Sequence, residues 1–176
     1  MKCMKLTALI IAAALLLSAC GAAPAPETAA PEQPEAAAPA PETETVDSPD
    51  LEGVYQQFQE KLSLPEMAAV SEKRRDAILG IAPEDCLQAV TVLCGDSVRA
   101  DEIWMIEAAD DAAADRIAEL AQVRLDQRAQ EMENYLPDQY QIVKQAKIVR
   151  EGRFVGLFVS PDADAMEELF RAAIAN

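Results

Sequence analysis

Residues 103–120 of this chain read IWMIEAADDAAADRIAEL, and residues 154–171 read FVGLFVSPDADAMEELFR. Each stretch begins with an apolar run, continues with acidic residues suited to capping a helix, and ends in a segment with apolar residues at helical spacing. We therefore predict that each stretch is a strand followed by a helix. The similarity between the two stretches is a weak indication of an internal duplication.

A further strand is predicted before each of these stretches. Strand-like segments at 87–94 and 102–108 are separated by Gly95-Asp96-Ser97, and segments at 142–150 and 153–160 surround Glu151-Gly152. The helix of the first stretch is expected to run from Asp110 or Asp111 to about Asn134. The helix of the second stretch is expected to begin at Asp162 or Asp164. Two strand-strand-helix units predict an α+β domain, with a four-stranded, mostly antiparallel sheet and the two helices across one face.

Two short helices are predicted before the first strand. One lies behind the capping residue Asp50 and ends before Pro65, and the other runs from Ser71 to a stop at Gly80. The strands at 103–106 and 154–159 are apolar on both sides, so both faces of the sheet need cover. The second face is expected to be covered by these two helices or by a second copy of the chain in a homodimer.

The N-terminus has the layout of an export signal. Two lysines precede an apolar run at 6–17, whose helical length of about 18 Å is too short for a hydrocarbon core of roughly 30 Å. Leu17-Ser18-Ala19-Cys20 looks like the lipobox of bacterial lipoproteins, in which the cysteine is lipidated and becomes the first mature residue. We predict that 1–19 is a cleaved signal peptide and that Cys20 anchors the chain to the extracytoplasmic face of the cell membrane.

Residues 20–50 are predicted to be a disordered linker, because they are rich in Pro, Ala and Glu and lack Lys, Arg and aromatic residues. Residues 51–176 then form a single globular domain, which 126 residues are enough to build. Removing 1–19 deletes two of the 15 basic residues and none of the 31 acidic ones, so the net charge changes from −16 to −18. Such a charge argues against nucleic acid as a partner.

The residues available for chemistry are few. The chain has no histidine, which excludes Ser-His-Asp triads, Cys-His pairs and His-ligated zinc, and it has no phosphate-binding glycine loop or EF-hand loop. Asp162 and Asp164 are interpreted as helix caps rather than calcium ligands. We expect no cofactor, no metal site and no catalytic residue, although Asp101-Glu102 at a strand start is a candidate cation or acid–base pair, with a solvated loop end favoured.

Cys86 and Cys94 lie eight residues apart on one predicted strand, a separation of about 26 Å. Disulfide Cα atoms lie roughly 4.4 to 6.8 Å apart, so these cysteines should not bridge within a monomer. Buried apolar packing is the favoured role for both, and a thiolate nucleophile is the alternative.

Basic residues collect in two places. Arg116, Arg124 and Arg128 share a stripe of the long helix, and Lys144, Lys147, Arg150 and Arg153 lie on the second hairpin. With Tyr135 and Tyr140 between them, we consider a face for an anionic or carbohydrate ligand made of Arg124, Arg128, Tyr135, Tyr140, Lys144 and Lys147. The favoured alternative is that the arginines pair with neighbouring carboxylates and the tyrosines pack under the Pro137 turn.

Several motifs together carry a family resemblance: the lipobox, the Pro/Glu linker, Ile78-Leu79-Gly80-Ile81, Arg99-Ala100-Asp101-Glu102-Ile103, the Arg124 helix, Tyr135-Leu136-Pro137-Asp138-Gln139-Tyr140 and the Gly152 hairpin. Over 51–176 the chain resembles a family of Gram-positive bacterial lipoproteins whose domain has no assigned function. The resemblance implies one surface-located domain and no particular activity, and only the two strand cysteines depart from a simple member.

Two classes of function follow. The first is a non-enzymatic module that binds a cell-wall component, a peptide or a membrane-protein partner. The second is a small extracytoplasmic enzyme that depends on carboxylates or on Cys86 or Cys94. We favour the first, because no catalytic pattern is present.

Overall fold

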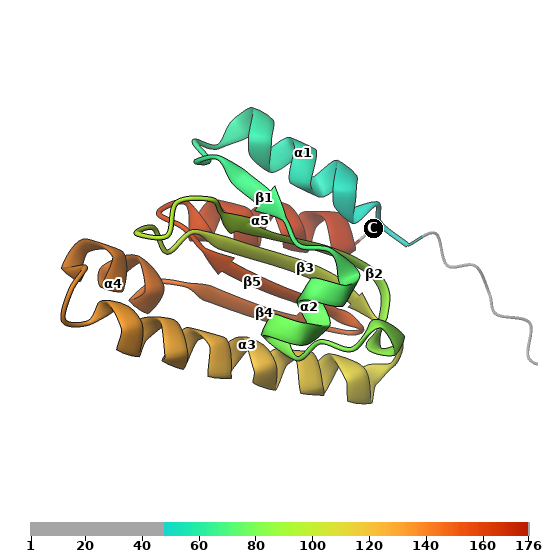
Figure 1. Ribbon diagram of the computed structural model, residues 1–176. Coiled ribbons are helices and arrows are strands. Elements are labelled where there is room, and N and C mark those ends of the chain that lie inside the picture. The colour runs from blue at the N-terminus through green and yellow to red at the C-terminus, as the bar shows by residue number, and fades with distance from the viewer. Residues whose placement is uncertain (1–47, 176) are drawn as a thin grey trace, which may run out of the picture. The chain divides into compact units, whose positions relative to one another are not determined.

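The computed structural model describes residues 48–175, which form an α+β domain as predicted. Its centre is an antiparallel sheet of five strands in the order β1-β2-β3-β5-β4 (Figure 1). The strands are β1 (Met67–Ala69), β2 (Cys86–Cys94), β3 (Glu102–Ala108), β4 (Lys147–Glu151) and β5 (Phe154–Val159). The helices are α1 (Leu51–Lys61), α2 (Glu72–Leu79), α3 (Asp111–Met132), α4 (Pro137–Lys144) and α5 (Ala163–Ile174), with a short 3-10 turn η1 (Pro83–Asp85).

The central strand β3 is buried at all seven positions. Its side chains alternate between two separate hydrophobic cores, because successive residues of a strand point to opposite faces. Trp104 and Ile106 enter the first core, and Ile103 and Met105 enter the second. β3 therefore organises the packing on both faces.

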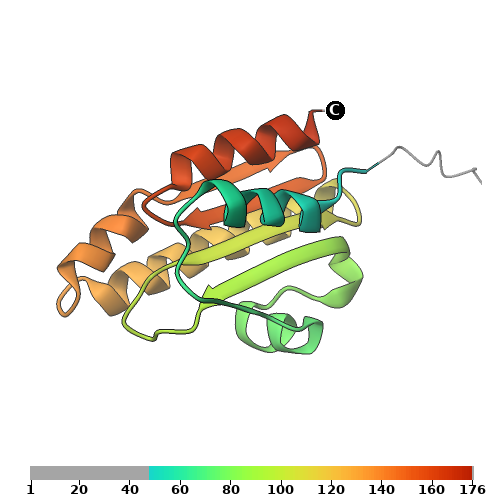
Figure 2. The ribbon, with the colours of Figure 1, turned by 90° about the horizontal axis from the view of Figure 1, so that it is seen from above.

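The two cores have different helical covers, as Figures 1 and 2 show. The first core is covered by α3, together with residues from the end of α2 and from α4; its helical members include Leu79, Ala113, Ile117, Ala121, Met132 and Val143. The second core is covered by α1 and α5, whose buried members include Leu51, Val54, Phe58, Met166 and Phe170. Phe158 of β5 makes edge contacts with Phe58 and with Phe170.

Two of the predicted capping residues and both predicted turn glycines act as the sequence predicts. Asp110 Oδ1 accepts a hydrogen bond from the backbone N–H of Ala113 at 2.7 Å, and Asp50 caps α1 in the same way through Glu52. Gly80 ends α2 at φ 71°, and Gly152 turns the β4–β5 hairpin at φ 55°, two conformations that favour glycine. Ser71 precedes α2 and Asp162 precedes α5, but neither side chain makes a capping bond, so the predicted capping role of these two residues is wrong.

The prediction that the two later helices share one face is wrong. α3 lies on the Trp104 face of the sheet and α5 on the Met105 face. The sequence does not decide which face each helix covers, because β3 and β5 carry apolar residues on both sides and a helix can pack against either side. The two N-terminal helices also separate: α1 joins α5, and Leu79 of α2 packs in the core beneath α3.

The predicted strand at 142–150 is also partly wrong. Its first part is helical in α4, and only Lys147 onward pairs with β5. Pro137 occupies the first turn of α4, where its fixed φ favours a helix, and Val143 is buried in the first core. The sheet also has one strand more than predicted, since the short β1 pairs with the end of β2 that carries Cys94.

The chain enters the domain beside a buried carboxylate at one end of β3. Glu107 accepts hydrogen bonds from Ser48 Oγ at 2.9 Å, Gln88 Nε2 at 2.9 Å and Arg153 Nη2 at 3.0 Å. Gln88 Nε2 also donates to the carbonyl oxygen of Pro49. These contacts hold the last residues of the predicted linker against the sheet.

Three predictions fall outside the described residues: the signal peptide at 1–19, lipidation of Cys20, and all but the last residues of the 20–50 linker. Across 48–175, none of the helices combines the length and the apolar character needed to cross a membrane.

Gly156 of β5 provides a test of the second core. A Cβ atom at this position would lie 2.8 Å from Phe158 Cζ and 3.1 Å from Phe170 Cε1, so Gly156→Ala is expected to destabilise the fold by about 1–3 kcal/mol through overpacking. Urea unfolding measures this change. Gly95→Ala is the control, because its nearest neighbour would be the Glu66 carbonyl oxygen at 3.8 Å. Equal midpoints for the two variants would contradict the close packing around Gly156.

Candidate functional site

A cleft lies where the β2–β3 loop meets the C-terminal half of α3 and the segment that leads into α4. Its inner cavity, of about 200 Å³, is lined by Leu93, Cys94, Asp96, Ser97, Arg99, Asp101, Glu102, Arg124 and Arg128. The adjoining outer cavity, of about 390 Å³, shares Asp96 and Arg99 and adds Val98, Tyr135, Leu136, Pro137, Asp138 and Gln139. We call the two cavities together the arginine cleft.

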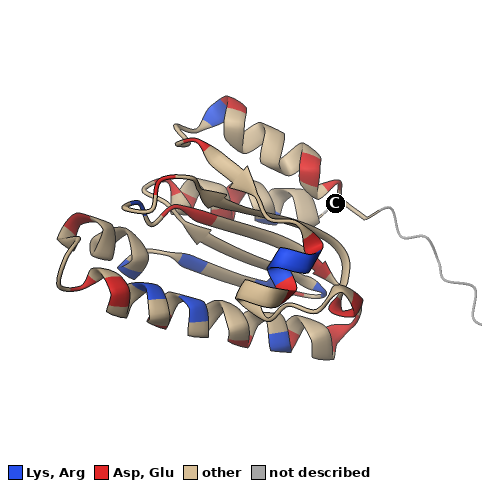
Figure 3. Cartoon of the chain, viewed as in Figure 1, with Lys and Arg blue, Asp and Glu red and all other residues tan. Residues whose placement is uncertain are grey.

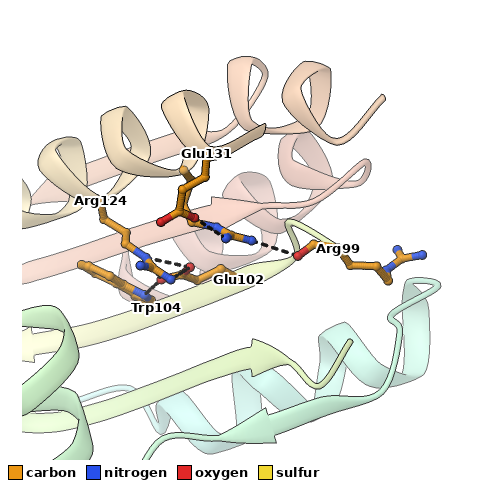
Figure 4. A network of polar contacts seen from close by, with 6 residues as sticks. Arg99, Glu102, Trp104, Arg124 and Glu131 are labelled. Carbon is orange, nitrogen blue, oxygen red and sulfur yellow. Dashed lines mark hydrogen bonds and ion pairs between the residues drawn. The ribbon is translucent and has the colours of Figure 1, made fainter. Parts of the chain in front are cut away.

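The floor of the arginine cleft is a buried ion pair. Arg124 of α3 reaches Glu102 at the start of β3 in a forked geometry, with Nε 3.0 Å and Nη2 2.9 Å from Glu102 Oε2 (Figure 4). Trp104 Nε1 donates to Glu102 Oε1 at 2.7 Å. The Glu102 side chain is 2% exposed, so its charge depends on these donors for compensation.

A second arginine holds the β2–β3 loop. Arg128 Nη2 donates to the carbonyl oxygen of Arg99 at 2.9 Å, and Arg128 Nη1 donates to Glu131 at 2.7 Å. Arg99 Nε in turn donates to Asp101 Oδ2 at 3.0 Å. From the α4 side, Gln139 accepts a hydrogen bond from the backbone N–H of Ala100 at 2.8 Å. The loop is thus positioned by both α3 and α4.

The outer cavity carries an exposed apolar rim. Tyr135 is 84% exposed and Val98 is 53% exposed, although both are large hydrophobic residues. Aromatic side chains left in solvent beside arginines favour contact with a ligand, since they supply flat apolar area with little entropy to lose. The cleft therefore combines an interior lined mostly by charged and polar residues with a margin that carries two exposed apolar side chains.

The structure brings together three of the six residues considered as a ligand face. Arg124, Arg128 and Tyr135 line the arginine cleft, whereas Tyr140 packs against the first core. Lys144 lines a different cavity, between α3 and α4. Lys147 forms an ion pair with Asp164 at 2.6 Å, and this hydrogen bond raises the pKa of Lys147.

Most basic side chains named in the sequence follow the alternative interpretation and pair with carboxylates. Arg116 bonds to Asp85, a contact that raises the pKa of Arg116, and Arg150 pairs with Asp115 at 2.9 Å. Figure 3 shows basic and acidic positions interspersed along α3. The predicted stripe of arginines is present, but its guanidinium groups form ion pairs with carboxylates of the domain.

Two residues of the β2–β3 loop, Val98 and Arg99, were missed as site residues. They line the arginine cleft, yet their side chains follow no periodic pattern in the sequence. The only signal was that 99–103 belongs to the motifs of the family resemblance. Asp101-Glu102 is not a solvated loop end, because both residues are buried.

The two cysteines are free, which confirms the prediction that they do not bridge. They occupy the two ends of β2. Burial raises the pKa of the Cys86 thiol, and the neighbouring Arg75 guanidinium offsets part of this effect. Cys94 lines the inner cavity.

The two acidic residues considered as an acid–base pair both form ion pairs. Glu102 and Asp101 in the cleft each have a guanidinium partner, so neither is placed as a free general base. Within residues 48–175, no group of three or more His, Cys, Asp or Glu side chains is placed to hold a metal ion.

Comparison with known sequences identifies one family. The pattern of the family described as Domain of unknown function (DUF4358) matches residues 47–160, which include the whole sheet and the arginine cleft. The predicted resemblance to a domain without an assigned function is thereby confirmed. No curated protein and no solved structure was found to be similar to the chain.

The Glu102–Arg124 pair leads to a prediction on stability. Arg124→Met leaves the Glu102 carboxylate buried without its guanidinium partner, so we expect a loss of about 3–5 kcal/mol in the free energy of unfolding. Fluorescence of Trp104, the single tryptophan of the chain, reports unfolding in urea directly beside the pair.

Two further variants control this experiment. Arg171→Met removes a half-exposed arginine of α5 and should leave the urea midpoint nearly unchanged. Glu102→Met combined with Arg124→Met should recover part of the loss, because no unpaired buried charge remains. A double variant as unstable as the sum of the two single variants would contradict this explanation.

Proposed function

The chain belongs to the family described as Domain of unknown function (DUF4358), and from that premise we propose that it is a non-enzymatic binding module, held at the outer face of the cell membrane by a lipid on Cys20. Its ligand is an anionic or carbohydrate-bearing component of the cell envelope: a cell-wall component, a peptide or a membrane-protein partner. The arginine cleft is the binding site.

The observation that carries this proposal is the composition of the arginine cleft. Arginine and carboxylate groups line its interior, and the exposed Tyr135 and Val98 stand at its margin. A ligand that presents polar groups beside an apolar surface matches both parts. Scattered exposed apolar residues need no explanation, but an exposed tyrosine beside a preformed polar cavity favours recognition.

The position of the cleft agrees with a tethered module. Glu102 lies in the cleft at the start of β3, whereas Glu107, near the other end of β3, contacts Ser48 where the chain enters the domain. The cleft therefore lies at the end of β3 away from the linker. A linker of thirty residues at about 3.1 Å per residue reaches up to roughly 90 Å, enough to carry such a cleft well beyond the lipid surface.

One observation favours a second candidate, a small enzyme with a cysteine nucleophile. Cys94 lines the inner cavity beside Arg124 and Arg128. A thiolate needs a base or a strongly stabilising environment, and the chain contains no histidine to act as that base. Cys94→Ser tests this second candidate, because it should abolish an enzymatic activity that depends on the Cys94 thiolate.

The anchor is tested by Cys20→Ala in the full-length chain. Without the thiol no lipid is attached, so we expect the variant to keep residues 1–19 and to lose the mass of the acyl chains. Mass spectrometry of the purified protein measures both changes. Cys3→Ala is the control, because Cys3 precedes the apolar run and lies within the segment predicted to be removed. Mature masses of wild type and Cys20→Ala that differ only by the replacement of cysteine by alanine would refute the anchor.

The binding site is tested by Tyr135→Ala and Val98→Asp. Both residues are exposed, so the fold should be kept while binding to purified insoluble cell-wall material falls by at least about tenfold in co-sedimentation. Leu87→Ala is the matched control, since Leu87 is 57% exposed but lies at the other end of β2. Equal sedimentation of wild type and the two cleft variants would exclude the cleft as the site.

A further inference from the structure

Two buried polar atoms beside the inner cavity lack a hydrogen-bond partner within the described residues. They are Asp101 Oδ1 and Arg128 Nε. Asp101 is 4% exposed and lines the same cavity as Arg128. An unpaired buried polar atom destabilises a fold, so such atoms are rare in native domains and call for a specific explanation.

The two atoms have opposite requirements. A carboxylate oxygen accepts hydrogen bonds and favours a cation, whereas a guanidinium N–H only donates and favours an anion. A ligand that satisfies both with charged groups presents a cationic donor and an anionic acceptor to one cavity of about 200 Å³. A simple anion satisfies Arg128 alone, and a sugar hydroxyl satisfies both atoms without the added strength of charge-assisted hydrogen bonds.

We propose that the inner cavity binds the ammonium and carboxylate groups of an α-amino acid, either free or at the end of a larger molecule. The ammonium pairs with Asp101 and the carboxylate with Arg128, while the side chain extends into the outer cavity toward Tyr135. This assignment rests on the proposed function of the arginine cleft as a binding site and names the ligand class.

The dimensions of the cleft suit such a ligand. The inner cavity is small and lined mostly by charged and polar residues, and the outer cavity, of about 390 Å³, offers the apolar surfaces of Val98, Tyr135 and Pro137. Together they separate the charged end of an amino acid from its side chain, as amino-acid sites require.

Both atoms are buried, so we expect an entering ligand to displace Arg99, the most exposed of the three arginines that line the inner cavity. Its side chain is 37% exposed, compared with 21% for Arg124 and 16% for Arg128, and it donates to the other oxygen of Asp101. An incoming ammonium competes with this guanidinium for the same carboxylate. Arg124 remains on Glu102, so the floor of the cleft is unchanged when the ligand enters.

The test is calorimetric titration of the full-length chain in detergent with both enantiomers of alanine, leucine, phenylalanine and glutamate. At least one is expected to bind saturably. The amine lacking the carboxylate and the acid lacking the ammonium are then titrated for the best binder; for phenylalanine these are phenethylamine and 3-phenylpropionate. Each is expected to bind at least about tenfold more weakly, because one charged hydrogen bond is lost.

Asp101→Asn should likewise weaken binding of the best amino acid at least about tenfold, with the Trp104 emission used to confirm the fold. Asp126→Asn is the matched control on the exposed side of α3 and should bind like wild type. The analogue comparison uses the wild-type chain, so it remains decisive even if Asp101→Asn does not fold.

The assignment is overturned if no amino acid binds, if either analogue binds as well as its parent, or if a folded Asp101→Asn variant binds like wild type. It fails separately from the proposed function. Loss of cell-wall binding in Tyr135→Ala with no amino-acid binding leaves the module intact and refutes this ligand. If an amino acid binds but Tyr135→Ala leaves cell-wall sedimentation unchanged, the amino-acid ligand is supported and the cleft is refuted as the cell-wall binding site.

Discussion

The burial of β3 on both faces is the constraint from which the rest of the domain follows. All seven residues of this strand are buried, including a carboxylate at its first position, Glu102, and another near its end, Glu107. A strand buried on both sides requires helices above and below the sheet, and α3 and α5 meet this requirement on opposite faces. The buried carboxylates require cationic partners, and Arg124 and Arg153 supply them.

The arginine that compensates the buried charge of Glu102 also lines the arginine cleft. Arg124 lies on α3 because Glu102 needs a donor there, and Arg128, one helical turn later on the same stripe, reaches the backbone of the β2–β3 loop. The loop is therefore held at a fixed distance from α3. The proposed binding at this cleft would use a surface that the stability of the domain already requires, and the residues proposed to contact the ligand would lie on rigid elements.

The two ends of β3 have different roles in the proposed module. At one end, Glu107, Gln88 and Ser48 tie the incoming chain to the sheet. At the other end, the cleft lies between the β2–β3 loop and the segment before α4. In the proposed module, this separation places the cleft at the end of β3 opposite to Ser48, where the predicted linker leads into the domain. The net negative charge of the chain would repel anionic lipid in such a module.

The sequence by itself determined the class of the fold and many of its local features. Apolar runs followed by acidic caps predicted β3 with α3 and β5 with α5, and glycines marked the stop of α2 and the β4–β5 turn, since these features depend on neighbouring residues alone. The face chosen by each helix was decided only by the tertiary structure, because β3 and β5 are apolar on both sides. The same holds for α4, where Ile142 and Val143 suit a strand as well as a helix, and for the site. Arg124 and Arg128 could be named from their helical spacing, but Arg99, Asp101 and Val98 reach the cleft through a loop whose path is set by contacts with α3 and α4. No periodic pattern of residues in the sequence predicts such contacts.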